Sequence, residues 1–157
     1  MMKILFICTA NICRSPLAEV ILKKKIREQG LADIEVLSAG IRNFEGRQRD
    51  TTMIAFARKA GYDLGGEAKY LTKELAESAD LIICMENQQK LELYHRFKPY
   101  VHWDRIHLFN EICFENPTDL IDPTGDTDYM YDVVLKRIER GCKKIVEKLS
   151  CSSQPIR

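Results

Sequence analysis

One short run of residues in this chain could perform nucleophilic chemistry on a phosphate ester. The run begins at Cys8, continues through five residues and ends at Arg14, and Ser15 and Pro16 follow it. A thiolate is a strong nucleophile, and a guanidinium group can hold two phosphate oxygens with its planar fork of donors. A cysteine and an arginine separated by five residues also occur by chance, so the position of the run in the fold decides its meaning.

The neighbouring elements place this run between a buried strand and a helix. Residues 3–7 (KILFI) are apolar and β-prone, which predicts a central strand that is buried on both faces. Ser15 and Pro16 are typical of a helix start, and the helical pattern continues to about residue 29. The backbone N–H groups of the loop and of the first helical turn can therefore converge on an anion. The same positive surroundings favour the thiolate form of Cys8.

Cleavage of an aryl phosphate ester such as phosphotyrosine would also need an acid, because the departing phenolate is a poor leaving group until it is protonated. Asp122 precedes Pro123 within residues 110–128, a stretch rich in Asn, Asp, Pro, Thr and Gly that predicts a long loop. Pro123 restricts Asp122 to an extended backbone, and loops commonly carry catalytic groups. We therefore choose Asp122 as the acid over three neighbouring aspartates, Asp119, Asp126 and Asp128.

The remaining elements alternate between strands and helices. Further strands are predicted over residues 35–37, 81–85 and 106–109, and further helices over 50–60, 72–78, 87–95 and 131–149. This order is typical of an α/β fold with a small parallel sheet and helices on both faces. Ligands of such sheets bind beyond the carboxyl ends of the strands, where the strand order reverses. We expect a single domain over residues 1–150 and a disordered tail over 151–157.

Composition argues against several classes of protein. The 157 residues carry a formal net charge of +1 from 24 basic and 23 acidic residues, so neither nucleic acid nor a membrane is expected as a partner. No apolar run approaches the roughly 18 residues of a membrane-spanning helix, and no secretory signal is evident; we expect a cytoplasmic protein. The six cysteines and three histidines lack metal-ligand spacing, so we expect no metal or other cofactor.

The segment from Cys8 to Glu19 (CTANICRSPLAE) resembles, almost residue for residue, the signature loop and first helix of the low-molecular-weight protein tyrosine phosphatases. Weaker matches follow in the same order along nearly the whole chain: Ser38 to Gly40 (SAG), Gly61 to Leu64 (GYDL), Asp80 to Met85 (DLIICM), and Asp122–Pro123. The resemblance implies a three-layer sandwich in which helices flank a four-stranded parallel sheet.

The resemblance also implies the catalytic roles. Cys8 is expected to be the nucleophile, Arg14 the group that holds the phosphate and the transition state, and Asp122 the general acid. The expected phosphate-binding and substrate-binding residues are Thr9, Ala10, Asn11, Ile12, Cys13, Ser15 and Phe44. Phe44 falls near a hydrophobic residue that lines the cleft in the family.

Three of the loop residues are expected to have a second role. Ser15 is implied to stabilise the thiolate by hydrogen bonding. Asn11 is implied to hold the strained shape of the loop through a network that includes Ser38. Cys13 matches a second loop cysteine that forms a reversible disulfide with the nucleophile, so Cys13 is the expected redox partner of Cys8.

The chain departs from the family pattern in three places. Asp-Pro is often followed by an aromatic residue in the family, but residues 124–125 here are Thr and Gly, so Tyr129 or Tyr131 could supply the missing wall. A histidine that commonly braces the loop is absent, and Glu67 lies nearest its place. Residues 42–49 (RNFEGRQR) replace a Gly-rich, Pro-containing stretch. These departures bear on substrate preference rather than on the chemistry.

The expected function is hydrolysis of phosphotyrosine and aryl phosphate monoesters through a cysteinyl-phosphate intermediate, by a monomer acting on phosphotyrosine-containing proteins. Three alternatives stay open. A thioredoxin-coupled arsenate reductase needs further cysteines, and only Cys84 lies in the right region. A protein-arginine phosphatase resembles the loop but carries threonine where Ile12 stands. A phosphate-binding module without catalysis is disfavoured by the intact set Cys8, Arg14, Ser15 and Asp122.

Overall fold

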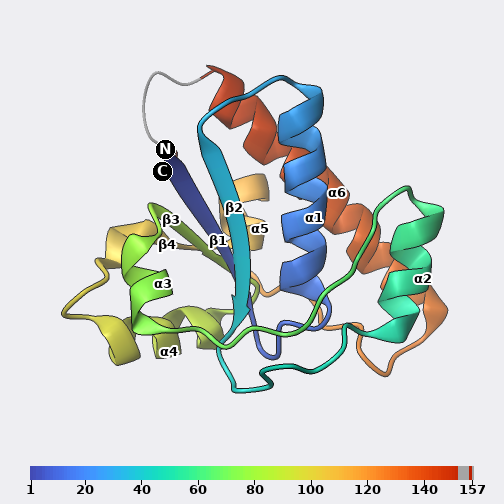
Figure 1. The fold of residues 1–157 in the computed structure, drawn as a ribbon, viewed down its shortest axis with the longest axis horizontal. Helices are drawn as coiled ribbons and strands as arrows, with labels where there is room; N and C mark the ends of the chain where they lie inside the picture. Colours follow the sequence, from blue (N-terminus) through green and yellow to red (C-terminus); the bar gives the residue numbers. More distant parts are fainter. Residues whose placement is uncertain (152–155, 157) are drawn as a thin grey trace.

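The predicted alternation of strands and helices is present in a computed structural model that describes residues 1–151 and 156 (Figure 1). The elements in chain order are β1 (Met2–Cys8), α1 (Arg14–Glu28), β2 (Ile34–Gly40), α2 (Thr51–Lys59), α3 (Lys73–Ser78), β3 (Leu81–Cys84), α4 (Asn87–Phe97), the 3-10 helix η1 (Trp103–Arg105), β4 (Ile106–Leu108), α5 (Phe109–Phe114) and α6 (Asp128–Cys151). None of the helices in this described part is long and apolar enough to cross a membrane.

The four strands form one parallel sheet in the order β2-β1-β3-β4. β1 is central, and its side chains alternate between two hydrophobic clusters, with Ile4 and Phe6 on one face and Leu5 and Ile7 on the other. Both faces are buried, as the apolar run predicted. The chain passes from β1 to β2 on one side and then crosses to β3 on the other. The strand order therefore reverses at the carboxyl end of β1.

Helices cover both faces of the sheet, which confirms the predicted three-layer α/β fold. On one face α1, α5 and α6 pack against β1 and β3, and α1 lies beside α6 (Figure 1). On the other face Ala76 of α3 and Leu93 and Phe97 of α4 join the second cluster. Because each face buries its own set of apolar side chains, β1 is held rigidly from both sides. That rigidity positions the loop that leaves β1.

Several predicted boundaries were wrong. Residues 110–128 were predicted as loop, but α5 occupies Phe109–Phe114 because Ile112 and Cys113 bury their side chains against α6. α6 starts at Asp128 and ends at Cys151, which lengthens the predicted final helix at both ends. β2 continues through Gly40, where it still pairs with Cys8.

Two further predictions concern the ends of elements. A helix was predicted over residues 72–78, and Thr72 stands at its N-cap, where the hydroxyl accepts a hydrogen bond from the backbone N–H of Leu75 at 3.2 Å. The disorder predicted beyond residue 150 falls almost entirely on residues outside those described. Of this tail the structure describes Cys151, which is the last residue of α6, and residue 156.

Candidate active site

The loop from Cys8 to Arg14 connects the end of β1 to the start of α1, at the edge of the sheet that the reversed strand order indicates. It lines a cavity of about 200 Å³. The lining residues are Cys8, Thr9, Ala10, Ile12, Cys13, Arg14, Phe44, Arg47, Asp122 and Thr124. The three predicted catalytic residues therefore share one cavity, together with most of the predicted binding residues.

Ser15 lies beneath this cavity and does not cap α1, contrary to our prediction. The helix begins at Arg14, and Cys13 at its N-cap makes no side-chain cap. The Ser15 hydroxyl instead lies 2.9 Å from the sulfur of Cys8. This contact agrees with the implied role of Ser15 toward the thiolate. The first helical N–H groups lack intrahelical acceptors, so an anion in the cavity can use them.

Arg14 is almost completely buried, with 2% of its surface exposed, and its guanidinium group is held by several acceptors. Nη1 donates to the carbonyl of Leu120 at 2.6 Å, and Nη2 lies 2.9 Å from the Glu86 carboxylate. Nη2 also lies 3.7 Å from the carboxylate of Asp122. These partners fix the orientation of the guanidinium plane. Sequence reasoning missed Glu86, which stands at the N-cap of α4.

A second contact links α4 to the loop. The amide of Gln89 accepts hydrogen bonds from the backbone N–H groups of Met85 and Glu86, both at 3.0 Å. The same side chain donates to the hydroxyl of Thr9 at 3.1 Å. The signal for Gln89 was present in the sequence, because a Gln three residues after a helix N-cap is typical of a capping box.

Asn11 organises the loop from behind the cavity. It is fully buried and adopts a left-handed backbone conformation, with φ of 59°. Its side-chain amide donates to the hydroxyls of Ser15 at 2.8 Å and Ser38 at 2.9 Å, and Ser38 donates in turn to Glu19. Its side-chain oxygen accepts from the backbone N–H of Lys69 at 2.9 Å. The predicted network of Asn11 and Ser38 is thus present, and Glu19 extends it.

Arg49 is a further partner of Asn11 that sequence reasoning missed. Its Nη1 donates to both the backbone and the side-chain oxygen of Asn11, the latter at 2.8 Å. Glu67, which we placed nearest the absent histidine, is exposed and is not a partner of Asn11. Arg49 belongs to residues 42–49, the stretch that departs from the family pattern, so no motif marked it.

The end of β2 approaches the loop closely at Gly40. A Cβ atom at this position would lie 2.9 Å from the carbonyl carbon of Ala10 and 3.0 Å from the carbonyl oxygen of Thr9. These are backbone atoms, which cannot rotate away. Glycine is therefore required here by close approach of two backbones.

Asp122 is the one aspartate of the four candidates that lines the cavity. Its side chain is 47% exposed, and Oδ1 accepts a hydrogen bond from the N–H of Thr124 at 3.0 Å. Asp119 instead accepts two hydrogen bonds from Asn87, the first residue of α4, at 2.7 and 3.0 Å. Its carboxylate therefore stabilises the start of that helix. Asp126 accepts from the N–H of Thr127. Of the four aspartates, Asp122 therefore shares the cavity with Cys8 and Arg14.

Neither tyrosine supplies the missing aromatic wall. Tyr131 is buried, stacks on Phe56 with ring centroids 6.0 Å apart, and accepts a hydrogen bond from the N–H of Gly125 at 3.3 Å. Burial and the carboxylate of Asp50 raise the pKa of Tyr131 to about 12. Tyr129 is 73% exposed and does not line the cavity. Thr124 lines the cavity, and Phe44 contributes an aromatic side chain to the same lining.

Cys84, Cys113 and Cys142 are buried in the core and do not line the cavity, and Cys151 is exposed. Burial raises the pKa of Cys84 well above its usual value, and Cys84 lies in the core of β3. Burial also raises the pKa of Cys113, to about 12. Cys13 has a strongly raised pKa because it is buried and lies near the negative charge of Asp50. The position of Cys84 does not fit the reactive cysteine of an arsenate reductase.

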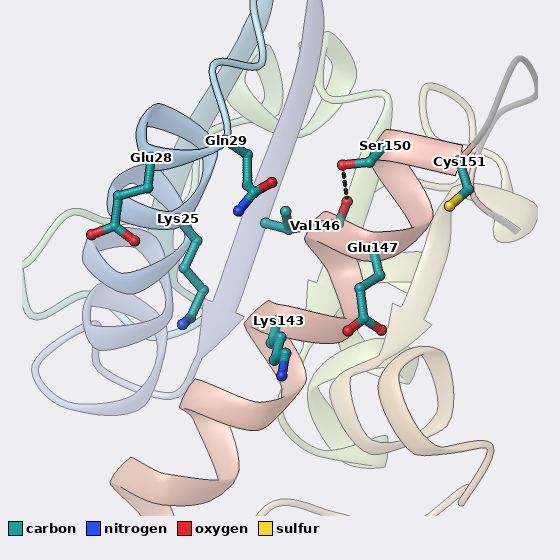
Figure 2. A pocket seen from close by; sticks show the side chains of 8 residues that line it. All are labelled: Lys25, Glu28, Gln29, Lys143, Val146, Glu147, Ser150 and Cys151. Carbon is teal, nitrogen blue, oxygen red and sulfur yellow. Dashed lines mark hydrogen bonds between the residues drawn. The ribbon is translucent and has the colours of Figure 1, made fainter.

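A larger cavity, of about 380 Å³, lies at the opposite end of α1, between that helix and α6 (Figure 2). Its lining residues are Lys25, Glu28, Gln29, Lys143, Val146, Glu147, Ser150 and Cys151. The Ser150 hydroxyl donates to the carbonyl of Val146 at 2.9 Å, so it is used within its own helix. The lining holds no arginine and no residue of the loop. The phosphate chemistry therefore belongs to the smaller cavity.

Comparisons with known proteins agree with this geometry. A family model described as low molecular weight phosphotyrosine protein phosphatase matches residues 3–154. A protein-arginine-phosphatase of Bacillus subtilis is 29% identical over 94% of this chain and 97% of its own length. A low molecular weight phosphotyrosine protein phosphatase of Sus scrofa is 27% identical over 93% of this chain and 94% of its own. The crystal structure of a protein tyrosine phosphatase from Entamoeba histolytica superimposes with a TM-score of 0.86 at 28% identity, covering 96% of this chain and 97% of the other.

Proposed function

Because the chain belongs to the low molecular weight phosphotyrosine protein phosphatase family, it is a hydrolase, and we propose that it cleaves phosphotyrosine and aryl phosphate monoesters through a cysteinyl-phosphate intermediate. The observation that carries this proposal is the single cavity lined by Cys8, Arg14 and Asp122. A nucleophile, a clamp for phosphate oxygens and a proton donor are the three groups that the reaction requires.

In the first step the thiolate of Cys8 attacks phosphorus. The new P–S bond forms as the P–O bond to the phenol breaks, and Asp122 transfers its proton to the departing oxygen. Arg14 and the loop N–H groups hold the other phosphate oxygens and stabilise the charge of the transition state. Glu86 and the carbonyl of Leu120 keep the guanidinium group in the orientation that this role needs.

In the second step water hydrolyses the intermediate. Asp122, now a carboxylate, takes a proton from the attacking water, the P–O bond forms and the P–S bond breaks. Cys8 returns to its thiolate form, and inorganic phosphate is released. Asp122 is partly exposed and lines the cavity. Water can therefore reach it after the phenol has left. One residue thus serves as acid and then as base.

The walls of the cavity support an aromatic substrate. Ile12 and Phe44 are apolar, and the guanidinium group of Arg47 lies 4.9 Å from the ring centroid of Phe44. A phenyl ring can pack on these two side chains, and the small Thr124 also lines the cavity. Phosphoarginine is the second candidate, because the Bacillus subtilis relative is named for that activity. The guanidinium group of that substrate is polar and charged, so it gains less than a phenyl ring from an apolar contact at Ile12.

Two peptides that differ only in the phosphorylated residue test this preference. We expect kcat/KM to be at least tenfold higher for phosphotyrosine than for phosphoarginine, and Ile12→Thr to narrow that ratio. Cys8→Ser is the control, since it removes the nucleophile and should abolish turnover of both peptides. A wild-type preference for phosphoarginine would overturn the tyrosine assignment, and activity in Cys8→Ser would overturn the mechanism.

We further propose that the enzyme acts as a cytoplasmic monomer on phosphotyrosine-containing proteins. The six cysteines are all unpaired, which suits a reducing compartment. Sedimentation equilibrium and cell fractionation test this proposal. A mass of two chains, or recovery outside the cytoplasm, would contradict it.

A further inference from the structure

We propose that Arg49 is a positioning residue of the catalytic loop: its buried guanidinium group holds Asn11 in the backbone conformation that the loop requires. This inference rests on the proposed phosphatase function. Arg49 does not line the cavity, so it cannot contact the substrate phosphate there. Its contacts are to the loop from behind, and its effect on the reaction therefore passes through Asn11.

The conformation of Asn11 needs support. A non-glycine residue is strained in the left-handed region, although Asn tolerates it better than most residues. Arg49 Nη1 donates to the backbone carbonyl and to the side-chain oxygen of the same residue. A single donor group therefore fixes the backbone of Asn11 relative to its side chain. Arg49 is itself anchored, because its Nε donates to the carbonyl of Gly65 at 3.1 Å.

Asn11 transmits this constraint to the nucleophile. Its side-chain amide donates to the Ser15 hydroxyl at 2.8 Å, and that hydroxyl lies 2.9 Å from the sulfur of Cys8. The same amide donates to Ser38 at 2.9 Å. Rotation of the Asn11 side chain would break both contacts together. Arg49 is thus connected to the nucleophile by a continuous chain of buried hydrogen bonds.

The charge of Arg49 supports a functional reason for its burial. Only 6% of its surface is exposed, and it makes no salt bridge with any carboxylate in the part of the chain that the structure describes. Burial lowers the pKa of Arg49, while the negative charges of Glu19 and Cys8 oppose that shift. Burying a cation without an ion-pair partner is costly. The thiolate and the Glu19 carboxylate are the charges that compensate it.

Arginine suits this position because its donors point in two directions. Nε reaches Gly65 while Nη1 reaches Asn11, and the planar group fixes the angle between them. Lysine has one ammonium group on a flexible stem, so it can replace one of these contacts but not both. Arg49→Lys should therefore restore part of what Arg49→Met removes.

The experiment measures kcat, KM and inhibition by inorganic phosphate with p-nitrophenyl phosphate as substrate. We expect Arg49→Met to lower kcat roughly 10- to 100-fold, the size of effect that follows when a catalytic group is misplaced by about 1 Å. Inhibition by phosphate should weaken in parallel, because the loop amides no longer converge, and Arg49→Lys should fall between Arg49→Met and wild type. Arg58→Met removes an exposed arginine from α2 and should leave both quantities unchanged.

A double-mutant cycle with Asn11→Ala decides the route of the effect. If Arg49 acts through Asn11, kcat of Arg49→Met/Asn11→Ala is no lower than that of Asn11→Ala alone. The inference would be overturned if the kcat losses of the two single variants multiplied in the double variant. It would also be overturned if Arg49→Met kept the wild-type kcat and the wild-type inhibition by phosphate. Circular dichroism verifies folding, and Arg49→Lys takes the place of Arg49→Met in the cycle if the latter does not fold. A wild-type enzyme without turnover would contradict the proposed function instead, so the two failures are distinguishable.

Discussion

Asp122 differs from the other two catalytic groups in its exposure, since Cys8 and Arg14 are almost fully buried. An exposed carboxyl group on a loop can deliver a proton and then admit water. Asp122→Asn removes the proton but keeps the shape of the side chain. We expect turnover of aryl phosphates with a weakly acidic phenol to fall roughly 10²–10⁴-fold. Substrates with an acidic phenol should lose much less, because their phenolates depart without protonation.

The measurement is kcat across a series of aryl phosphates. Asp126→Asn is the matched control, because Asp126 is exposed, lies on the same loop and does not line the cavity. An equal loss for good and poor leaving groups in Asp122→Asn would indicate a structural role. Leaving-group sensitivity in Asp126→Asn would show that the wrong aspartate was chosen.

Cys13 is expected to protect Cys8 during oxidation. Peroxide converts the Cys8 thiolate to a sulfenic acid, and the Cys13 thiol displaces water from it to form a disulfide. The raised pKa of Cys13, caused by burial and by Asp50, leaves little thiolate and makes this capture slow. We expect a brief exposure to dilute peroxide to be reversed by thiol in the wild type and less completely in Cys13→Ser. Peptide mapping locates the linkage, and equal recovery of both proteins would leave Cys13 as a packing residue.

The reactive residues could be predicted at this scale, whereas their supports could not. Cys8, Arg14 and Asp122 are recognisable because the chemistry restricts which residue types can perform it. Arg49 lies 38 residues from Asn11 in the sequence, and the types of the two residues do not predict their contact. Only the fold brings the segment before α2 against the loop.

At the scale of elements, two glycines allow close packing with different consequences. Gly40 lets the end of β2 approach the backbone of the catalytic loop, and Gly141 lets α6 approach the ring of Phe109, whose Cζ would lie 2.2 Å from an added Cβ. Gly40→Ala should displace the loop and lower kcat/KM roughly 10- to 100-fold. Gly141→Ala should destabilise the fold by about 1–3 kcal/mol through overpacking, while the folded enzyme keeps its kcat.

Urea unfolding and steady-state kinetics on both variants separate the two effects. The same substitution is made in each case, so each variant is the control for the other. A Gly40→Ala enzyme with wild-type kcat/KM would show that the loop can yield to the added methyl group. A Gly141→Ala protein as stable as wild type would show that α6 can move away from Phe109.

The elements themselves were predictable where the sequence pattern was local. The apolar run of β1 predicted a central strand because such a strand must be apolar on both faces. The start of α1 was predicted two residues late, because Ser15 is a favourable N-cap residue in isolation but its hydroxyl is used by Cys8 and Asn11. α5 was missed because Asn and Glu interrupt its short apolar pattern, and only packing against α6 stabilises it.

For the whole molecule, His107 makes the free energy of unfolding depend on pH. Burial of this half-buried residue of β4 lowers its pKa, and a backbone hydrogen bond with Asp104 only partly opposes the shift. The unfolded chain therefore binds the proton more readily than the folded protein. Stability from this group is complete above about pH 6.5, the ordinary pKa of histidine. It is lost as the pH falls from there toward the lowered pKa of the folded state.

Urea unfolding from pH 7.5 to pH 5.5 measures this dependence. We expect the loss of stability on acidification to be smaller in His107→Gln than in wild type. His95→Gln is the matched control, because His95 is exposed on α4, and it should follow the wild-type curve. Identical pH dependence in His107→Gln and wild type would show that another group is responsible.

The contact between Arg49 and Asn11 also has a consequence for the evolution of the family. A loop that needs a donor behind Asn11 can take it from more than one segment of the chain, and loss at one place must be compensated at another. Relatives with arginine at the position of Arg49 should therefore tend to lack the bracing histidine near the position of Glu67, and relatives with that histidine should vary freely at the arginine position. Such anticorrelated substitutions would show that an arginine and a histidine can each supply the donor that the loop needs behind Asn11.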